Sequence, residues 1–314
     1  MGAPWKIVFF GTPPFAIPTL KVLIEGRDPV VAVVTQPDRK KGRGQKVAPT
    51  PVKELALRYG LPVLQPERVK EETFLGYIRT LQPDLFVVVA YGEILPEALL
   101  GVPEQGAVNV HASLLPKYRG AAPIAWAILK GEEETGVTTM MMDEGMDTGD
   151  ILLQAKIAIG QRETGESLYE RLASLGAPLL KETLEGMKAG TIRPRAQDHT
   201  LASSAPSIKK EDGWIDWKRE AKEIDRQVRA LCPWPGAFTR WEGKFLKIYK
   251  GELREGSAKG RPGTVSWVGA DFIGVETGEH SFLIQEVQLE GGKRMGVRDF
   301  LSGHPVVVGT TFEL

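Results

Sequence analysis

Residues 107–150 read AVNVHASLLPKYRGAAPIAWAILKGEEETGVTTMMMDEGMDTGD, and the fold is organised around this stretch. An apolar segment at 107–110 predicts a short strand, a helical pattern follows at 121–130, and a second apolar segment at 136–142 predicts another strand. Polar side chains stand at the ends of these elements and in the acidic, glycine-containing turn 143–150. Because ligands bind outside the carboxyl ends of strands in open α/β sheets, this stretch predicts a sheet and its site together.

Three side chains in this stretch are suited to acyl-transfer chemistry. Asn109 and His111 are two residues apart on an extended segment, so both can point to the same face. Asn109 can donate from its amide and His111 from either ring nitrogen, and two donors aimed at one point suit a developing oxyanion. A nearby carboxylate would orient the imidazole. Asp147 is the best candidate for that carboxylate, and on the residues alone Asp143 and Asp150 remain alternatives.

Other chemistries have less support in the sequence. The nucleophile motif G-x-S-x-G is absent, and the single cysteine, Cys232, lies in a Cys-Pro-Trp-Pro segment. This favours direct transfer of a group between two bound substrates. A metal site is disfavoured, because no H-x-x-x-H or paired-cysteine spacing is present. The simplest alternative for His111 and Asp147 is a structural histidine beside an ordinary acidic turn.

The N-terminal part of the chain alternates strand patterns with helical patterns, which predicts an α/β domain with a Rossmann-like, mostly parallel sheet. The apolar run 85–89 predicts a strand that is buried on both faces. The motifs G-x-G-x-x-G and G-x-x-x-x-G-K-[ST] are absent. Their absence disfavours a nicotinamide oxidoreductase and a nucleotide hydrolase.

The C-terminal part of the chain has a different pattern. Residues 190–206 are polar and contain prolines, so they predict a linker between a domain at 1–189 and a smaller one at 207–314. Short strand patterns with glycine turns between residues 237 and 290 predict a small β-barrel. One cysteine, no signal-peptide pattern and no apolar run of ~20 residues lead us to expect a cytoplasmic protein with no membrane association. We also expect a monomer, although these features do not bear on oligomeric state.

Charge is distributed in local patches. The 314 residues include 40 basic and 40 acidic ones, so a nucleic acid could be bound only through such patches. Residues 36–49 form a long glycine-containing loop pattern with five basic residues and one acidic residue. Residues 240–261 hold seven basic and three acidic residues. Both patches are suited to contacts with phosphates. A solvated linker is the simpler alternative for the first patch when its charge is taken alone, and solvated surface is an equal alternative for the second.

The segments at 109–111, 113–120 and 147–150 resemble the 10-formyltetrahydrofolate-dependent formyltransferases, which share an Asn–His–Asp constellation and an S-L-L-P loop. The similarity extends over nearly the whole chain and is greatest for members that formylate methionyl-tRNA. The supporting segments lie at 10–13, 35–39, 42–44, 89–92 and 233–236.

The resemblance implies a catalytic role for Asn109, His111 and Asp147, with 10-formyltetrahydrofolate as cosubstrate and no metal. It implies transfer of the formyl group to the α-amine of initiator methionyl-tRNA, and a second domain that is OB-like. The folate-binding residues that we expect are Ser113, Leu114, Leu115, Pro116, Ala90, Tyr91, Gly92, Leu95 and Asp143. The tRNA-binding residues that we expect are Lys40, Lys41, Arg43, Lys46, Lys209 and Lys247, with Arg43 central to a loop that enters the acceptor end.

Two alternatives stay open within this interpretation. Relatives that formylate the amine of a sugar nucleotide share the catalytic core, and the basic patches at 36–49 and 240–261 favour tRNA over that substrate. A non-catalytic RNA- or folate-binding protein is disfavoured, because all three catalytic-type residues are present.

Overall fold

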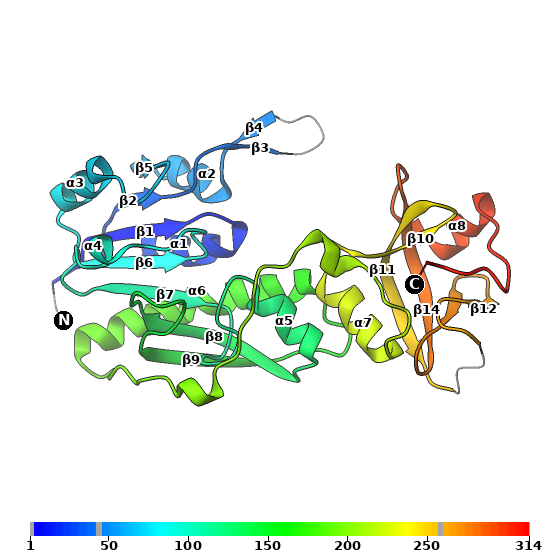
Figure 1. Cartoon of the computed structure of the whole chain (residues 1–314). Coiled ribbons are helices and arrows are strands. Elements are labelled where there is room, and N and C mark those ends of the chain that lie inside the picture. The colour runs from blue at the N-terminus through cyan, green and yellow to red at the C-terminus, as the bar shows by residue number, and fades with distance from the viewer. Residues whose placement is uncertain (1–2, 42–45, 257–259, 314) are drawn as a thin grey trace. The chain divides into compact units, whose positions relative to one another are not determined.

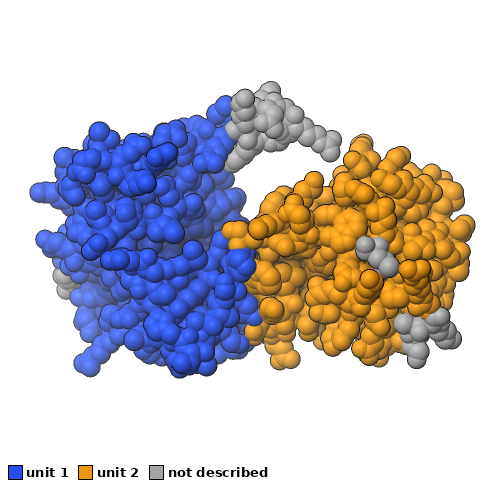
Figure 2. All heavy atoms as spheres, viewed as in Figure 1, with its two compact units in different colours: residues 1–123, 134–158, 169–206 blue, residues 124–133, 159–168, 207–314 orange. Residues whose placement is uncertain are grey.

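The computed structural model describes residues 3–41, 46–256 and 260–313. By compactness the chain divides into two units (Figure 2). The first comprises Met1–Pro123, Glu134–Ala158 and Tyr169–Pro206, and the second comprises Ile124–Glu133, Ile159–Leu168 and Ser207–Leu314. The second unit thus includes two short segments that precede residue 207 in the chain. The domain limits expected from the sequence, 1–189, 190–206 and 207–314, stay a prediction.

The first unit is built on a seven-stranded sheet in the order β5-β2-β1-β6-β7-β8-β9 (Figure 1). Its strands are β1 (Ile7–Gly11), β2 (Val30–Val34), β5 (Val63–Leu64), β6 (Leu85–Val89), β7 (Ala107–His111), β8 (Glu134–Met141) and β9 (Ile151–Ala158). Pairing is parallel from β5 to β7 and antiparallel for β8 and β9. The expected mostly parallel sheet is confirmed. The antiparallel edge was not expected from the alternating pattern, and the turn between β8 and β9 is too short for a parallel crossover.

The centre of this sheet is apolar, as the run at 85–89 predicts. Strands β1 and β6 are buried along their whole length. Phe10 and Phe86 belong to a buried cluster that also contains Phe74 and Ile78 of helix α3, so this helix covers one face of the sheet. Because β1 and β6 are buried on both faces, their side chains are apolar, and polar side chains near these strands occur only where the strands end.

Helices connect these strands. They are α1 (Ile17–Ile24), α2 (Pro51–Arg58), α3 (Glu72–Leu81), α4 (Glu97–Leu100), α5 (Pro123–Lys130) and α6 (Gly165–Ala189), with short 3-10 turns at Pro14–Ala16 and His199–Leu201. Thr50 caps α2, since its side chain accepts a hydrogen bond from the backbone N–H of Lys53 at 3.1 Å. Among the described residues, no helix is long and apolar enough to cross a membrane.

The basic segment at 36–49 contains a short antiparallel hairpin rather than only a loop. Strand β3 (Arg39–Lys41) pairs with β4 (Lys46–Ala48), and Lys41 lies opposite Lys46. The hairpin extends from the first unit as a separate two-stranded sheet (Figure 1). Strand β3 is entirely basic and β4 contains one lysine, so no apolar alternation predicts strands in this segment.

The main sheet of the second unit is antiparallel, in the order β10-β11-β14-β13-β12, with β15 paired to β14. Its elements are a 3-10 turn at Lys210–Gly213, α7 (Ala221–Ala230), β10 (Ala237–Trp241), β11 (Lys244–Arg254), β12 (Val265–Val268), β13 (Ile273–Glu276), β14 (Ser281–Leu289), β15 (Met295–Gly296) and α8 (Val297–Gly303). The C-terminal segment joins the two edges: the Phe312 N–H donates to the Gly263 carbonyl at 2.8 Å, and the Glu313 N–H donates to the Arg240 carbonyl at 3.3 Å. These bonds close the sheet into a barrel-like ring.

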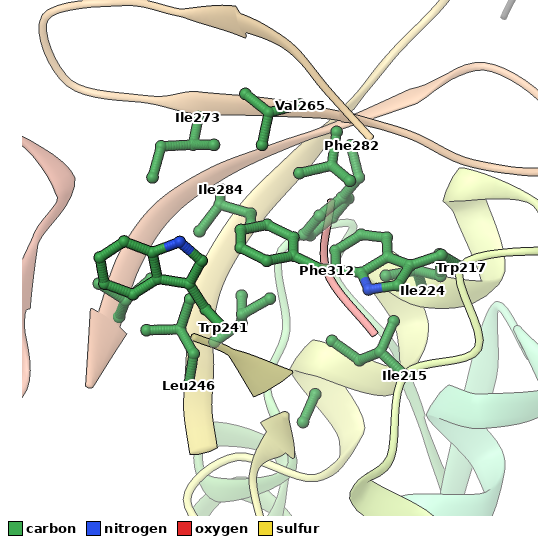
Figure 3. Close-up of a cluster of buried hydrophobic side chains, with 14 of the residues drawn as sticks. Ile215, Trp217, Ile224, Trp241, Leu246, Val265, Ile273, Phe282, Ile284 and Phe312 are labelled. Atoms are coloured by element: carbon green, nitrogen blue, oxygen red, sulfur yellow. The ribbon is translucent and has the colours of Figure 1, made fainter. Parts of the chain in front are cut away.

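A single aromatic core fills this barrel (Figure 3). The rings of Trp217 and Phe312 stack with their centroids 5.8 Å apart, and Trp241 meets Phe300 of α8 edge-on at 5.5 Å. Ile224 of α7 is also fully buried in this cluster. The core therefore ties α7, α8 and the C-terminal segment to the strands, which explains how the second unit holds together.

Candidate active site

The first part of the candidate site is the end of β7. Asn109 and His111 lie on this strand, with Asn109 opposite Met140 and His111 opposite Thr138 of β8. Both residues are buried, with exposed fractions of 9% and 6%. Polar groups so deeply buried need hydrogen-bond partners, and both find them in loops at this edge of the sheet.

The second part is the turn after β8, which returns Asp147 to β7. Asp147 Oδ2 lies 3.5 Å from His111 Nδ1 and accepts a hydrogen bond from the Gly120 N–H at 2.8 Å. Asp147 Oδ1 accepts from Asn109 Nδ2 at 3.3 Å. The structure thus brings together the amide, the imidazole and the carboxylate that the sequence singled out.

The two alternative carboxylates in this turn are placed differently. Asp143 is exposed and accepts hydrogen bonds inside its own turn, from the Gly145 N–H at 3.0 Å and the Thr148 hydroxyl at 2.6 Å. Asp150 is exposed, and its backbone carbonyl accepts from the Met141 N–H at 2.9 Å. The geometry therefore favours Asp147 as the partner of the imidazole, while Asp143 shapes the turn.

A second contact of His111, on the other side of the ring from Asp147, shows which ring nitrogen carries a hydrogen. His111 Nε2 lies 3.0 Å from the backbone carbonyl of Tyr118. A carbonyl can only accept, so Nε2 carries a hydrogen and donates it. Nδ1 is therefore the ring nitrogen that faces Asp147 and is available for chemistry. The sequence alone left both ring nitrogens open.

Unusual backbone conformations aim these groups. Tyr118 has φ 61°, Gly120 has φ 120° and Asp147 has φ 54°, all in the left-handed region. This conformation directs the Tyr118 carbonyl to the imidazole and the Gly120 N–H to the carboxylate. A Cβ on Gly120 would lie 2.8 Å from the Ala205 carbonyl oxygen, so the position also requires glycine for space. Strain of this kind is concentrated at functional sites.

The S-L-L-P loop is fastened to the same sheet edge. Thr138 is fully buried; its hydroxyl donates to the Ser113 carbonyl at 2.6 Å and accepts from the Leu115 N–H at 3.1 Å. Gln154 of β9 donates to the Leu115 carbonyl at 2.9 Å. The side chains of Ser113 and Leu115 are buried, whereas Leu114 and Pro116 are partly exposed. The loop therefore offers a fixed backbone and two accessible side chains to a ligand.

The segment after β6, which adjoins β7 in the sheet, is accessible at only some of the predicted residues. Tyr91 and Leu95 are each 2% exposed and belong to the hydrophobic core. Burial raises the pKa of the Tyr91 hydroxyl, which finds no hydrogen-bond partner among the described residues. Ala90 and Gly92 are exposed and have positive φ angles of 47° and 94°. Of the predicted folate-binding residues in this segment, only Ala90 and Gly92 are thus accessible.

One contributor to the site was not expected. Gln197 lies in the stretch interpreted as a linker, yet it is 6% exposed and donates to the carbonyls of Asp147 at 2.9 Å and Gly149 at 2.7 Å. Its Oε1 accepts from Arg119 Nη2 at 2.6 Å. A lone glutamine in a polar stretch carries no local pattern, so no sequence signal could have identified it.

The predicted tRNA-binding residues are spread over both units. Lys40 and Lys41 are on β3, Lys46 is on β4, and Arg43 lies outside the described residues. In the second unit, Lys209 is exposed just before a 3-10 turn, and Lys247 of β11 donates to the Pro235 carbonyl at 2.7 Å. Within the part of the chain that the structure describes, no three His, Cys, Asp or Glu residues are grouped to hold a metal ion.

Comparison with known families agrees with this fold and site. Residues 5–184 match the family described as formyl transferase, and residues 207–305 match the formyl transferase C-terminal domain. The chain belongs to the formyl transferase family.

Similar sequences narrow this class further. The methionyl-tRNA formyltransferase of Trichlorobacter lovleyi is 53% identical over 306 residues, which cover 98% of this chain and 96% of that relative. The methionyl-tRNA formyltransferase of Caldanaerobacter subterraneus is 52% identical over 306 residues, 97% of this chain and 99% of the relative. Identity of this level over almost both full lengths places the chain among the methionyl-tRNA formyltransferases.

Solved structures share the fold at lower identity. An N-formyltransferase from Helicobacter canadensis, in complex with folinic acid and dTDP-3-aminofucose, has a TM-score of 0.67 and 21% identity, covering 93% of this chain and all of that one (100%). HypX from Aquifex aeolicus, in complex with tetrahydrofolic acid, has a TM-score of 0.62 and 19% identity, covering 99% of this chain and 51% of that one. At such identities the likeness concerns the fold alone.

Proposed function

We propose that this protein transfers the formyl group of 10-formyltetrahydrofolate to the α-amino group of initiator methionyl-tRNA. The observation that carries the proposal is the convergence of Asn109 and His111 on the Asp147 carboxylate. The identity of 53% to a methionyl-tRNA formyltransferase supports the choice of substrates.

The reaction forms a C–N bond between the formyl carbon and the amine, and it breaks the bond between that carbon and N10 of the folate. A free α-amine has a pKa of about 7.7–8.0, and esterification of the carboxyl group lowers it, so neutral amine is present near pH 7 without a strong base. The demanding species is the tetrahedral intermediate, whose oxygen carries developing negative charge. Catalysis therefore depends on donors fixed around that oxygen.

Asn109 and His111 supply these donors in our proposal. One hydrogen of Asn109 Nδ2 is directed at Asp147, which leaves the second for the oxyanion. In our proposal His111 acts as the imidazolium: Nε2 donates to the Tyr118 carbonyl, and the second ring hydrogen, on the Nδ1 atom that faces Asp147, is the one available to the oxyanion. A preorganised donor of this type is worth about 3 kcal/mol of transition-state stabilisation.

Asp147 holds the imidazole and assists proton transfer. The attacking amine must lose a proton and the departing folate nitrogen must gain one, so the net reaction needs a relay rather than a strong base. Asp147 Oδ2 lies 3.5 Å from His111 Nδ1 and is steadied by the Gly120 N–H. We propose that this carboxylate passes the proton, with a water molecule completing the path.

The substrates are held by two groups of residues. For the folate we propose the 113–116 loop, the accessible backbone at Ala90 and Gly92, and the turn around Asp143. For the tRNA we propose phosphate contacts from Lys40, Lys41, Arg43, Lys46, Lys209 and Lys247. Since translation initiation takes place in the cytoplasm, we propose that the protein acts there, as a monomer.

The test is to incubate the protein with 10-formyltetrahydrofolate and either charged initiator tRNA or an amino-sugar nucleotide. Formylation of methionyl-tRNA with little product from the sugar is the expected result. Preferential formylation of the sugar amine would replace the proposal with sugar N-formyl transfer; the N-formyltransferase structure from Helicobacter canadensis contains an amino-sugar nucleotide, dTDP-3-aminofucose. Formylation of neither substrate would contradict the proposal.

A further inference from the structure

Gln197 is a buried side chain whose whole hydrogen-bonding capacity is used at the candidate site. Its Nε2 donates to two backbone carbonyls, those of Asp147 at 2.9 Å and Gly149 at 2.7 Å. Its Oε1 accepts from Arg119 Nε at 3.1 Å and from Arg119 Nη2 at 2.6 Å. An amide offers two donors and two lone pairs, so every one of them is occupied.

The two residues joined by Gln197 belong to the two segments that position the catalytic groups. Arg119 lies between Tyr118, whose carbonyl binds His111, and Gly120, whose N–H binds Asp147. The carbonyls that accept from Gln197 Nε2 are that of Asp147, the residue with the left-handed conformation, and that of Gly149 two residues later. One side chain therefore connects the segment that holds the imidazole with the turn that holds the carboxylate.

The backbone around Gln197 strengthens this connection. The Arg119 N–H donates to the Ser203 carbonyl at 2.8 Å, and the Ala205 N–H donates to the Arg119 carbonyl at 2.7 Å. The Tyr118 N–H donates to the Ser203 hydroxyl at 2.9 Å. Segment 197–205 is thus fastened to the 118–120 segment by main-chain bonds, and Gln197 extends that attachment to the turn.

The outer side of the turn is exposed. Its middle residues, Glu144, Gly145 and Met146, are exposed, and Met146 is 59% exposed. A Cβ on Gly149 would clash with the Met141 carbonyl oxygen, so the turn passes close to β8 at this point. The amide of Gln197 holds the backbone of the turn on both sides of Thr148, at the Asp147 and Gly149 carbonyls.

We infer that Gln197 and Arg119 are positioning residues that set the distance between the Asp147 carboxylate and His111 Nδ1, and through it the rate of the transfer step. This inference rests on the proposed function for its kinetic consequence and on the described contacts for its geometry. Neither residue touches the reacting atoms. A displacement of about 1 Å in a catalytic group can cost on the order of 100-fold in rate, so loss of the brace should act on kcat.

The test compares two buried glutamines. Gln197→Met keeps the size of the side chain and removes both donors to the turn. Gln227→Met is the matched control, because Gln227 is 4% exposed and its Nε2 also donates to two backbone carbonyls, those of Asp212 and Trp214, each at 2.8 Å. Gln197→Met loses its two bonds to the turn and its two bonds from Arg119, whereas Gln227→Met loses only its two bonds to backbone carbonyls. A larger fall in Tm is therefore expected for Gln197→Met, and kcat at a temperature well below both Tm values is compared.

We expect the two variants to differ in kcat. Gln197→Met should lower kcat by roughly 10- to 100-fold while KM for folate and for tRNA changes less than about threefold. Gln227→Met should keep kcat. Gln197→Glu should behave like Gln197→Met, because a carboxylate retains the contact with Arg119 but cannot donate to the turn. Unchanged kcat in Gln197→Met, or equal losses in both Met variants, would overturn the inference.

A second measurement separates this inference from the proposed function. The ¹⁵N NMR signal of the His111 Nδ1 atom reports its hydrogen bonding without any substrate. We expect it to move in Gln197→Met and to stay in place in Gln227→Met. An unmoved signal in Gln197→Met would contradict the inference even if the protein formylated no tRNA, whereas inactivity of the unmodified protein would contradict only the proposed function.

Discussion

The turn that carries Asp147 and the β3–β4 hairpin belong to the same unit, yet they are held in opposite ways. The turn is bonded close to its functional residue, by Gly120 and Asn109 at the carboxylate and by Gln197 at the backbone. The hairpin is fastened at its base, where Lys53 Nζ lies 2.6 Å from Asp38 Oδ2 and 2.7 Å from Gln65 Oε1.

This difference follows from what each element has to do. Transfer of a formyl group requires donors and a proton acceptor held within a fraction of an ångström of their working positions. Recognition of a polyanionic RNA depends on charge, which acts over several ångströms and tolerates variation in geometry. A braced turn and a hairpin anchored at its base therefore suit a chemical role and a binding role respectively.

The largest effect should come from the braced region. His111→Ala removes the donor at Nδ1 and the partner of Asp147, and we expect kcat to fall on the order of 10³-fold with folate affinity unchanged. Steady-state kinetics together with a folate-binding titration would measure this. His280→Asn is the control, since it removes an imidazole whose Nδ1 is 3.0 Å from the Gly256 carbonyl in the second unit. Equal losses in the two variants would argue against a catalytic role for His111.

A smaller effect should come from the base of the hairpin. Lys53→Met breaks the half-buried contact with Asp38 and loosens the attachment of β3, so KM for tRNA should rise by about tenfold, equivalent to ~1.4 kcal/mol, with kcat retained. Titration of tRNA at saturating folate would show this. Lys156→Met is the control, because Lys156 forms an exposed pair with Glu134 at 2.8 Å in the same unit. A fall in kcat instead of a rise in KM would contradict the proposed division of roles.

The smallest effect should come from a single phosphate contact in the second unit. Lys209→Ala should weaken tRNA binding by a few-fold and reduce the slope of log K against log salt by about 1. Binding measured at several salt concentrations would give the slope. Lys222→Ala is the control, since Lys222 is paired with Glu220 at 2.7 Å. Equal slopes for Lys209→Ala and the unmodified protein would remove Lys209 from the interface.

The sequence predicted best those features that local pattern determines. The apolar run at 85–89 forms a fully buried strand, and the spacing of Asn109 and His111 places both on one strand end. These predictions hold because burial on both faces of a strand and alternation along it are properties of neighbouring residues. The mostly parallel sheet followed from the repeated alternation of strand and helix patterns.

Contacts between distant segments could not be predicted in this way. Gln197 reaches the Asp147 turn across 50 residues of sequence, and the Tyr118 carbonyl selects the tautomer of His111 only because of a left-handed backbone. The closure of the second sheet by the C-terminal segment, through Phe312, likewise depends on main-chain bonds. Every residue carries a main-chain carbonyl, and nearly every residue a main-chain N–H. The residue types therefore do not show which of these groups will pair with a distant segment.

The most direct test of the account is a single-turnover experiment with Asp147→Asn. Asparagine keeps the size of the side chain and can still accept from the Gly120 N–H, but it removes the negative charge beside His111 Nδ1. With enzyme in excess over formyl-folate and charged tRNA, we expect the rate of formyl transfer to fall on the order of 10³-fold while both substrates bind as before. A transfer rate within threefold of that of the unmodified protein would contradict the role assigned to the carboxylate.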